Sequence, residues 1–91
     1  MVEKEYLLSR ILSYYKKLKS EKRVNFRILN LINFFDFAID YKDDLVKITN
    51  IKETLTSMIE CLKDINDNIY IHQNLKYLLN DRVNKYNEVY F

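Results

Sequence analysis

Few side chains in this chain have the chemistry of a catalytic or metal-binding residue. Cys61 is the only cysteine and His72 the only histidine, and eleven positions separate them. A zinc site needs three or four ligands at defined spacing, and a catalytic thiol needs an imidazole and an orienting group in the same pocket. No local motif supports either arrangement. We therefore interpret Cys61 as a small, partly buried residue and His72 as a turn or capping residue.

Two carboxylates are spaced for acid–base catalysis. Asp36 and Asp40 stand one helical turn apart in an otherwise apolar segment. Such a pair can act as a general acid and a general base. The same spacing also describes the exposed polar stripe of a mostly buried helix, and this is the interpretation we adopt. Phosphate-binding loops need several glycines, and the chain has none. We expect no enzymatic activity, no metal and no cofactor.

The absence of glycine and proline predicts the fold class. Proline ends helices, and glycine supplies the left-handed positions of tight turns and hairpins. We expect the 91 residues to form one all-α domain spanning residues 1–91. Charged residues make up 31% of the chain and the net charge is +2, which is typical of a folded domain.

The cellular setting follows from cysteine use and hydropathy. A lone cysteine forms no internal disulfide and favours a reducing compartment, so we expect a cytoplasmic protein. No apolar run approaches the roughly 18 residues that a membrane-spanning helix requires. The N-terminal residues also lack the basic-then-apolar order of a signal peptide. We expect no membrane association.

Apolar periodicity predicts a compact bundle of about four antiparallel helices. Their approximate ranges are 3–19, 26–41, 51–66 and 72–88. The second helix leaves only a narrow polar stripe, so it must be central or lie in an oligomer interface. We expect Asn25 to cap its N-terminus. Short helical structure or a plug at the end of the bundle is expected around Leu45.

The third helix carries a heptad seam. Asn50 and Glu53 resemble a capping box at its start, and Asn66-Asp67-Asn68 is expected to end it in place of glycine. Alternating steps of four and three are the spacing that packs against a neighbouring helix. The seam residues are Ile51, Leu55, Met58, Leu62, Ile65 and Ile69.

Basic residues gather in residues 10–27, where Glu21 is the one acid. Two interpretations stay open: a surface for phosphate, nucleic acid or an acidic partner, and solvated faces with favourable charge placement at a helix end. The candidate surface comprises Arg10, Lys16, Lys17, Lys19, Lys22, Arg23 and Arg27.

An aromatic run in the second helix also has two interpretations. Rings at this density ordinarily pack in a core, but they are also enriched at protein interfaces. The candidate apolar interface comprises Phe34, Phe35, Phe37 and Tyr41.

The C-terminal part of the chain resembles a known family. Asn68-Ile69 is followed by Leu75 and by the pair Leu78-Leu79, and a seam helix precedes them. This pattern in residues 51–91, with an upstream Leu12-Ser13-Tyr14-Tyr15 segment, resembles the helical collar domain of δ′-type subunits of bacterial DNA polymerase III clamp loaders. The chain departs from the family at Tyr70 and Ile71, where a second Asn and a Pro are usual. The resemblance implies subunit assembly without catalysis.

These features together predict a non-enzymatic helical module that acts through protein–protein contact. The class includes a small inhibitor or immunity-type protein of a phage, virus or plasmid, an accessory subunit of a larger assembly, and a collar-like oligomerisation domain. The partner is either another protein or a second copy of this chain. The alternative is a nucleic-acid-binding protein that uses residues 10–27, with an affinity that falls steeply as salt rises.

Overall fold

The computed structural model describes residues 3–60 and 71–91, and within these ranges it contains helices and no strand. The expected all-α fold is confirmed. The helices are α1 (Lys4–Ser20), α2 (Val24–Asp40), α3 (Lys42–Leu45), α4 (Ile51–Ile59) and α5 (Gln73–Tyr90). Residues 61–66 of the expected third helix and the Asn66-Asp67-Asn68 terminator lie outside the described residues.

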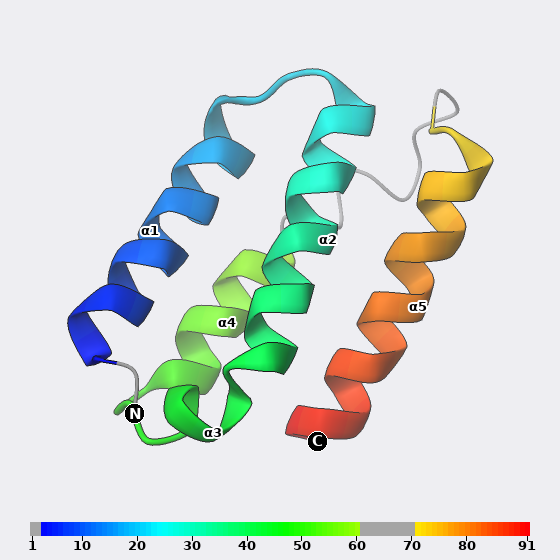
Figure 1. The fold of residues 1–91 in the computed structure, drawn as a ribbon. Coiled ribbons are helices and arrows are strands. Elements are labelled where there is room, and N and C mark those ends of the chain that lie inside the picture. Colours follow the sequence, from blue (N-terminus) through cyan, green and yellow to red (C-terminus); the bar gives the residue numbers. More distant parts are fainter. Residues whose placement is uncertain (1–2, 61–70) are drawn as a thin grey trace.

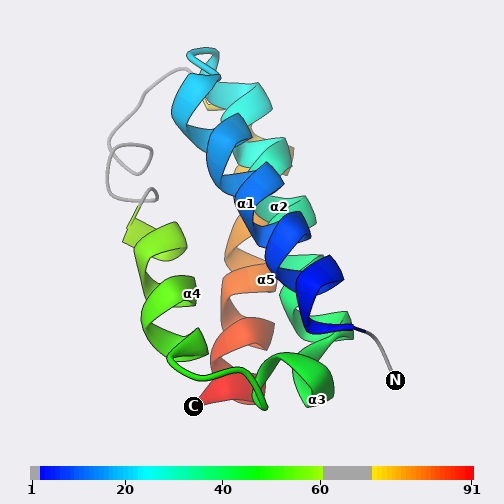
Figure 2. The same ribbon diagram turned by 90° about the vertical axis from the view of Figure 1, so that its left-hand side faces the viewer.

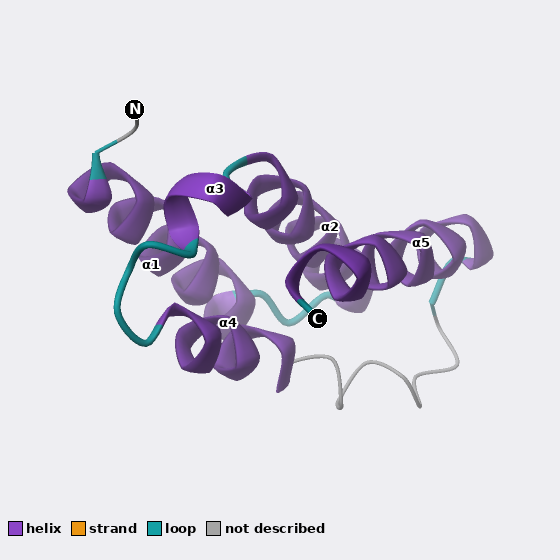
Figure 3. Cartoon of the chain, turned by 90° about the horizontal axis from the view of Figure 1, so that it is seen from below, coloured by secondary structure: helices purple, strands orange, loops and turns teal. Residues whose placement is uncertain are grey.

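Three helices lie side by side and a fourth covers one of their faces. Figure 1 shows α2 between α1 and α5, and Figures 2 and 3 show α4 across one face of this layer. Successive long helices run in opposite directions, so α2 and α5, two steps apart, run parallel. None of the described helices is long and apolar enough to cross a membrane.

The central position of α2 follows from its composition. Seven of its side chains are buried, and the rings of Phe34 and Phe35 have no solvent exposure. Burying a large apolar side chain contributes about 1.5–3 kcal/mol, so covering this helix is a main source of stability. The aromatic run is therefore part of the chain's own core, and Phe34, Phe35 and Phe37 form no exposed interface. Tyr41 is half-buried against the same core.

Two helix starts differ from expectation. α2 begins after Arg23, and the Asn25 side chain instead accepts a 3.0 Å hydrogen bond from the backbone N–H of His72. Asn50 precedes α4 in the left-handed conformation, with φ of 61°, and makes no capping bond through its side chain. The capping-box prediction was wrong because Asn50 makes the turn that glycine would otherwise make. His72 does cap α5, its Nδ1 accepting from the N–H of Asn74 at 3.2 Å.

The contact between α2 and α5 combines apolar and polar pairs. Phe35 packs against Tyr86 with ring centroids 5.3 Å apart, and Arg82 donates to Asp36 at 2.6 Å. Tyr90 stacks on Tyr86 at 4.6 Å and donates its hydroxyl to the carbonyl of Ala38 at 2.5 Å. The last carbonyls of a helix have no hydrogen-bond partner within that helix. The Tyr90 hydroxyl supplies a donor to one of them in α2, the carbonyl of Ala38, which α5 buries.

Tyr90→Phe should lower the free energy of unfolding by about 1–3 kcal/mol, because the carbonyl of Ala38 loses its donor while remaining buried. Urea unfolding followed by circular dichroism measures the change. Tyr77→Phe is the matched control, since Tyr77 is 73% exposed and should leave stability unchanged. Equal stabilities for Tyr90→Phe and the wild type would contradict this role of the hydroxyl.

Alkaline pH should also destabilise the fold. Burial raises the pKa of Tyr86 and Tyr90 above the ordinary tyrosine value of about 10. As pH rises, these phenols therefore ionise in the unfolded chain before they ionise in the folded one. The stability that they contribute to the folded state is complete below about pH 10 and is lost as pH rises further. We expect the free energy of unfolding to fall between about pH 10 and 12. Urea unfolding across this range should give a shallower decline for Tyr90→Phe than for Tyr77→Phe.

Candidate functional site

The structure removes Arg10 from the expected basic surface. Its guanidinium donates to the hydroxyls of Tyr6 and Tyr14, each at 2.8 Å, and lies 4.7 Å from the ring centroid of Phe37. Tyr6 and Tyr14 are on α1 and Phe37 is on α2. Cation–π contacts of this kind stabilise packing between elements. Arg10 therefore joins two helices of the chain itself.

Arg23 is also engaged within the chain. Its Nε and Nη2 donate to the two carboxylate oxygens of Glu21 at 2.9 and 3.1 Å, and its backbone N–H donates to the same carboxylate at 2.9 Å. These bonds lower the pKa of Glu21 to about 2. The pair neutralises its own charge in the connection between α1 and α2.

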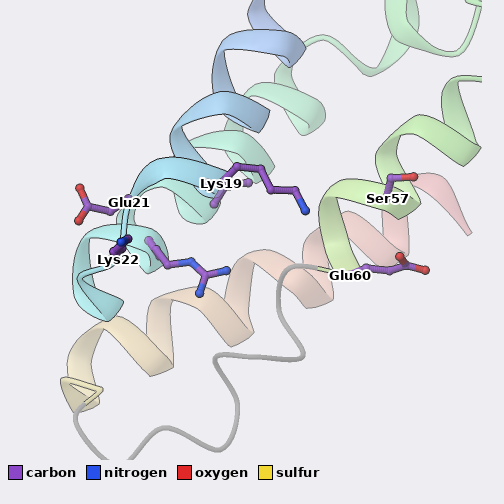
Figure 4. Close-up of a pocket in the computed structure, with 7 residues that line it drawn as sticks. Lys19, Glu21, Lys22, Ser57 and Glu60 are labelled. Carbon is purple, nitrogen blue, oxygen red and sulfur yellow. The ribbon is translucent and has the colours of Figure 1, made fainter.

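Three of the remaining cations lie around one hollow. Lys19 at the end of α1, Lys22 in the connection and Arg27 in the first turn of α2 line a hollow of about 590 Å³ (Figure 4). We call it the basic hollow, and its other lining residues are Leu18, Glu21, Ser57 and Glu60. Lys16 and Lys17 line a separate depression of about 350 Å³.

An apolar groove runs between α1 and α4. Leu8, Leu12 and Tyr15 form a stripe along α1, with exposed fractions of 39%, 52% and 39%. The groove has a volume of about 430 Å³, and Ile11 and Met58 are its buried members. We call it the α1–α4 groove, lined by Leu8, Ile11, Leu12, Tyr15, Thr54, Ser57 and Met58.

The groove and the basic hollow adjoin each other. Ser57 lines both, and Lys19 of the hollow lies 5.4 Å from the ring centroid of Tyr15 in the groove. The surface between α1 and α4 is therefore apolar along one stretch and cationic at the C-terminal end of α1. Leu8, Leu12 and Tyr15 follow the same helical spacing as the buried Leu7, Ile11 and Leu18, so periodicity alone does not separate the exposed stripe from the buried one. The sequence does indicate that part of this face stays exposed, because α1 has more apolar positions than a single buried stripe needs.

The residues considered for catalysis have other roles or lie outside the described part. Asp36 accepts the 2.6 Å hydrogen bond from Arg82, and Asp40 is exposed. His72 caps α5, and Cys61 lies outside the described residues. Across residues 3–60 and 71–91, no group of three or more His, Cys, Asp or Glu side chains is arranged to hold a metal ion.

Comparisons with known proteins give no match to a family model, a curated protein or a solved structure. The resemblance to clamp-loader collars stays a prediction. Of the residues on which it depends, Leu79 is buried, Leu78 is exposed, and Asn68 and Ile69 lie outside the described residues.

The pairing of Glu21 with Arg23 gives a direct test of this part of the site. Arg23→Gln should raise the Glu21 pKa from about 2 toward the ordinary value of about 4.3, because the neighbouring charge and two hydrogen bonds are lost. Carboxyl chemical shifts in an NMR titration measure it. Lys22→Gln removes an adjacent charge but leaves the pair of Glu21 and Arg23 intact. In this variant the Glu21 pKa should stay well below its ordinary value. An unperturbed Glu21 pKa in the wild type would contradict the observed contact.

Proposed function

We propose that this protein is a non-enzymatic module that binds another protein through the α1–α4 groove. The observation that carries the proposal is the stripe of Leu8, Leu12 and Tyr15, which α1 keeps exposed beside the buried Ile11 and Met58. Steps of four and three along a helix are the spacing with which one helix receives another. An amphipathic helix is the occupant that this groove fits best.

Charge around the groove points to the composition of that helix. Lys16 and Lys17 lie next to Leu12, and Lys19 follows Tyr15 by one turn. A partner helix with acidic residues beside its apolar stripe complements this rim. A second copy packed with α1 parallel to α1 would bring the two sets of lysines together, which charge repulsion disfavours. We favour a different protein as the occupant, and an antiparallel pair of copies is an outcome that the test below distinguishes.

Two roles remain proposals within this class: a small inhibitor or immunity-type protein of a phage, virus or plasmid, and an accessory subunit of a larger assembly. Both require a rigid surface presented by a stable bundle. Binding of nucleic acid along residues 10–27 has less support, because Arg10 and Arg23 are engaged within the chain and the other cations divide between two depressions.

The test is a capture experiment from the native host with two matched variants. Leu12→Asp places a charge in the groove, whereas Leu29→Asp makes the same change on α2, where Leu29 is 42% exposed and outside the groove. We expect one protein to be recovered by the wild type and by Leu29→Asp and lost with Leu12→Asp. With that protein purified, Leu12→Asp should weaken binding at least about tenfold, as for an interface hot spot.

Circular dichroism should confirm that both variants fold, because both positions are exposed. Recovery of the same proteins by all three chains would refute the groove as the binding surface. Light scattering of the purified chain adds a second check, for which we expect a monomer. A dimer that Leu12→Asp dissociates would instead identify a second copy as the occupant and contradict the proposed partner.

A further inference from the structure

We propose that the basic hollow binds a compact phosphate-type polyanion, with a diphosphate group as the ligand class. This inference rests on the charges of the hollow and is independent of the protein-binding role of the α1–α4 groove. Lys19, Lys22 and Arg27 come from three consecutive segments that the turn between α1 and α2 brings together. Within the described residues, no ion pair joins any of the three to a carboxylate.

Of the two acids of the hollow, one is paired with another residue, so the three cations share the hollow with one further carboxylate, that of Glu60. The Glu21 carboxylate is held by Arg23. Figure 4 shows Glu21 and Glu60 on opposite sides of the hollow, with Lys19 extending from α1 toward the helix that carries Ser57. Three cations that line one hollow repel one another, and an anion bound between them is attracted to all three.

Arg27 is the third cation of the hollow. Its Nε is buried, so a ligand in the hollow would meet the outer part of the guanidinium and not this atom. A guanidinium matches phosphate oxygens in its fixed fork geometry. These features together favour a multivalent anion over a single carboxylate.

The shape of the charge distribution favours a small ligand over a nucleic-acid strand. A strand needs cations along a track, as well as bases stacked on open rings. Here three cations face a single hollow of about 590 Å³, and Lys16 and Lys17 line a different depression. The hollow is large enough for a diphosphate and its first waters. Binding of a nucleic-acid strand is therefore the competing outcome that the test distinguishes.

The experiment is a calorimetric titration of the full chain with inorganic pyrophosphate at about 0.15 M ionic strength, where the Debye length is about 8 Å. We expect one saturable site. Lys19→Gln/Lys22→Gln should weaken binding by about tenfold or more, because two charge-assisted contacts are lost. Lys16→Gln/Lys17→Gln changes the net charge equally outside the hollow and should weaken it by less than about threefold. Arg27→Gln should weaken binding, and Arg27→Lys should restore part of the affinity.

Other ligands and variants separate the remaining outcomes. Tighter binding of ADP than of pyrophosphate would identify a nucleotide as the ligand, whereas equal affinity would identify the diphosphate group alone; both outcomes support the site. Leu12→Asp should bind pyrophosphate like the wild type, so failure of the groove proposal leaves this one standing. Absence of saturation at about 10 mM pyrophosphate would overturn the site. Equal weakening by the two double-lysine variants, or binding only of a single-stranded oligonucleotide, would also overturn it.

Discussion

The fold depends on the need to cover α2. This helix is apolar around most of its circumference, so no arrangement that leaves two of its sides in water is stable. α5 supplies Tyr86 and Tyr90 against one side, and α1 supplies Tyr14 and Arg10 against the other. The hydrogen bond of the Tyr90 hydroxyl and the ion pair of Arg82 fix the position of α5 along α2. Hydrophobic contacts alone are not directional and would not fix it.

The candidate surface is a consequence of the same arrangement. Because α2 occupies the centre, α1 lies at the edge of the layer and has one neighbour there instead of two. Its Leu7, Ile11 and Leu18 face the core, and the adjacent stripe that includes Leu12 stays open beside α4. The turn from α1 into α2 then gathers cations at one end of this groove. An apolar groove and a cationic hollow thus meet on one surface.

Periodicity located the helices because helical structure is largely a local property. The expected ranges 3–19, 26–41 and 72–88 match α1, α2 and α5 closely, and the start at residue 51 matches α4. The caps were less predictable. Asn25 and Asn50 have the residue type of a cap, but one bonds across the molecule to His72 and the other adopts a left-handed turn. A cap depends on the backbone angles and on what the side chain meets, and both are set by tertiary packing.

The sequence by itself determined an all-α chain, because glycine and proline are absent and the apolar spacing is helical. It also supplied the cations and the apolar stripes. Only the tertiary structure decided their uses: Arg10 lies within an aromatic contact, Arg23 is neutralised by Glu21, and Lys19 faces the hollow. Similar side chains on similar helical positions acquire different roles because their neighbours differ. For Arg10 and the basic hollow, some of those neighbours come from helices distant in the sequence.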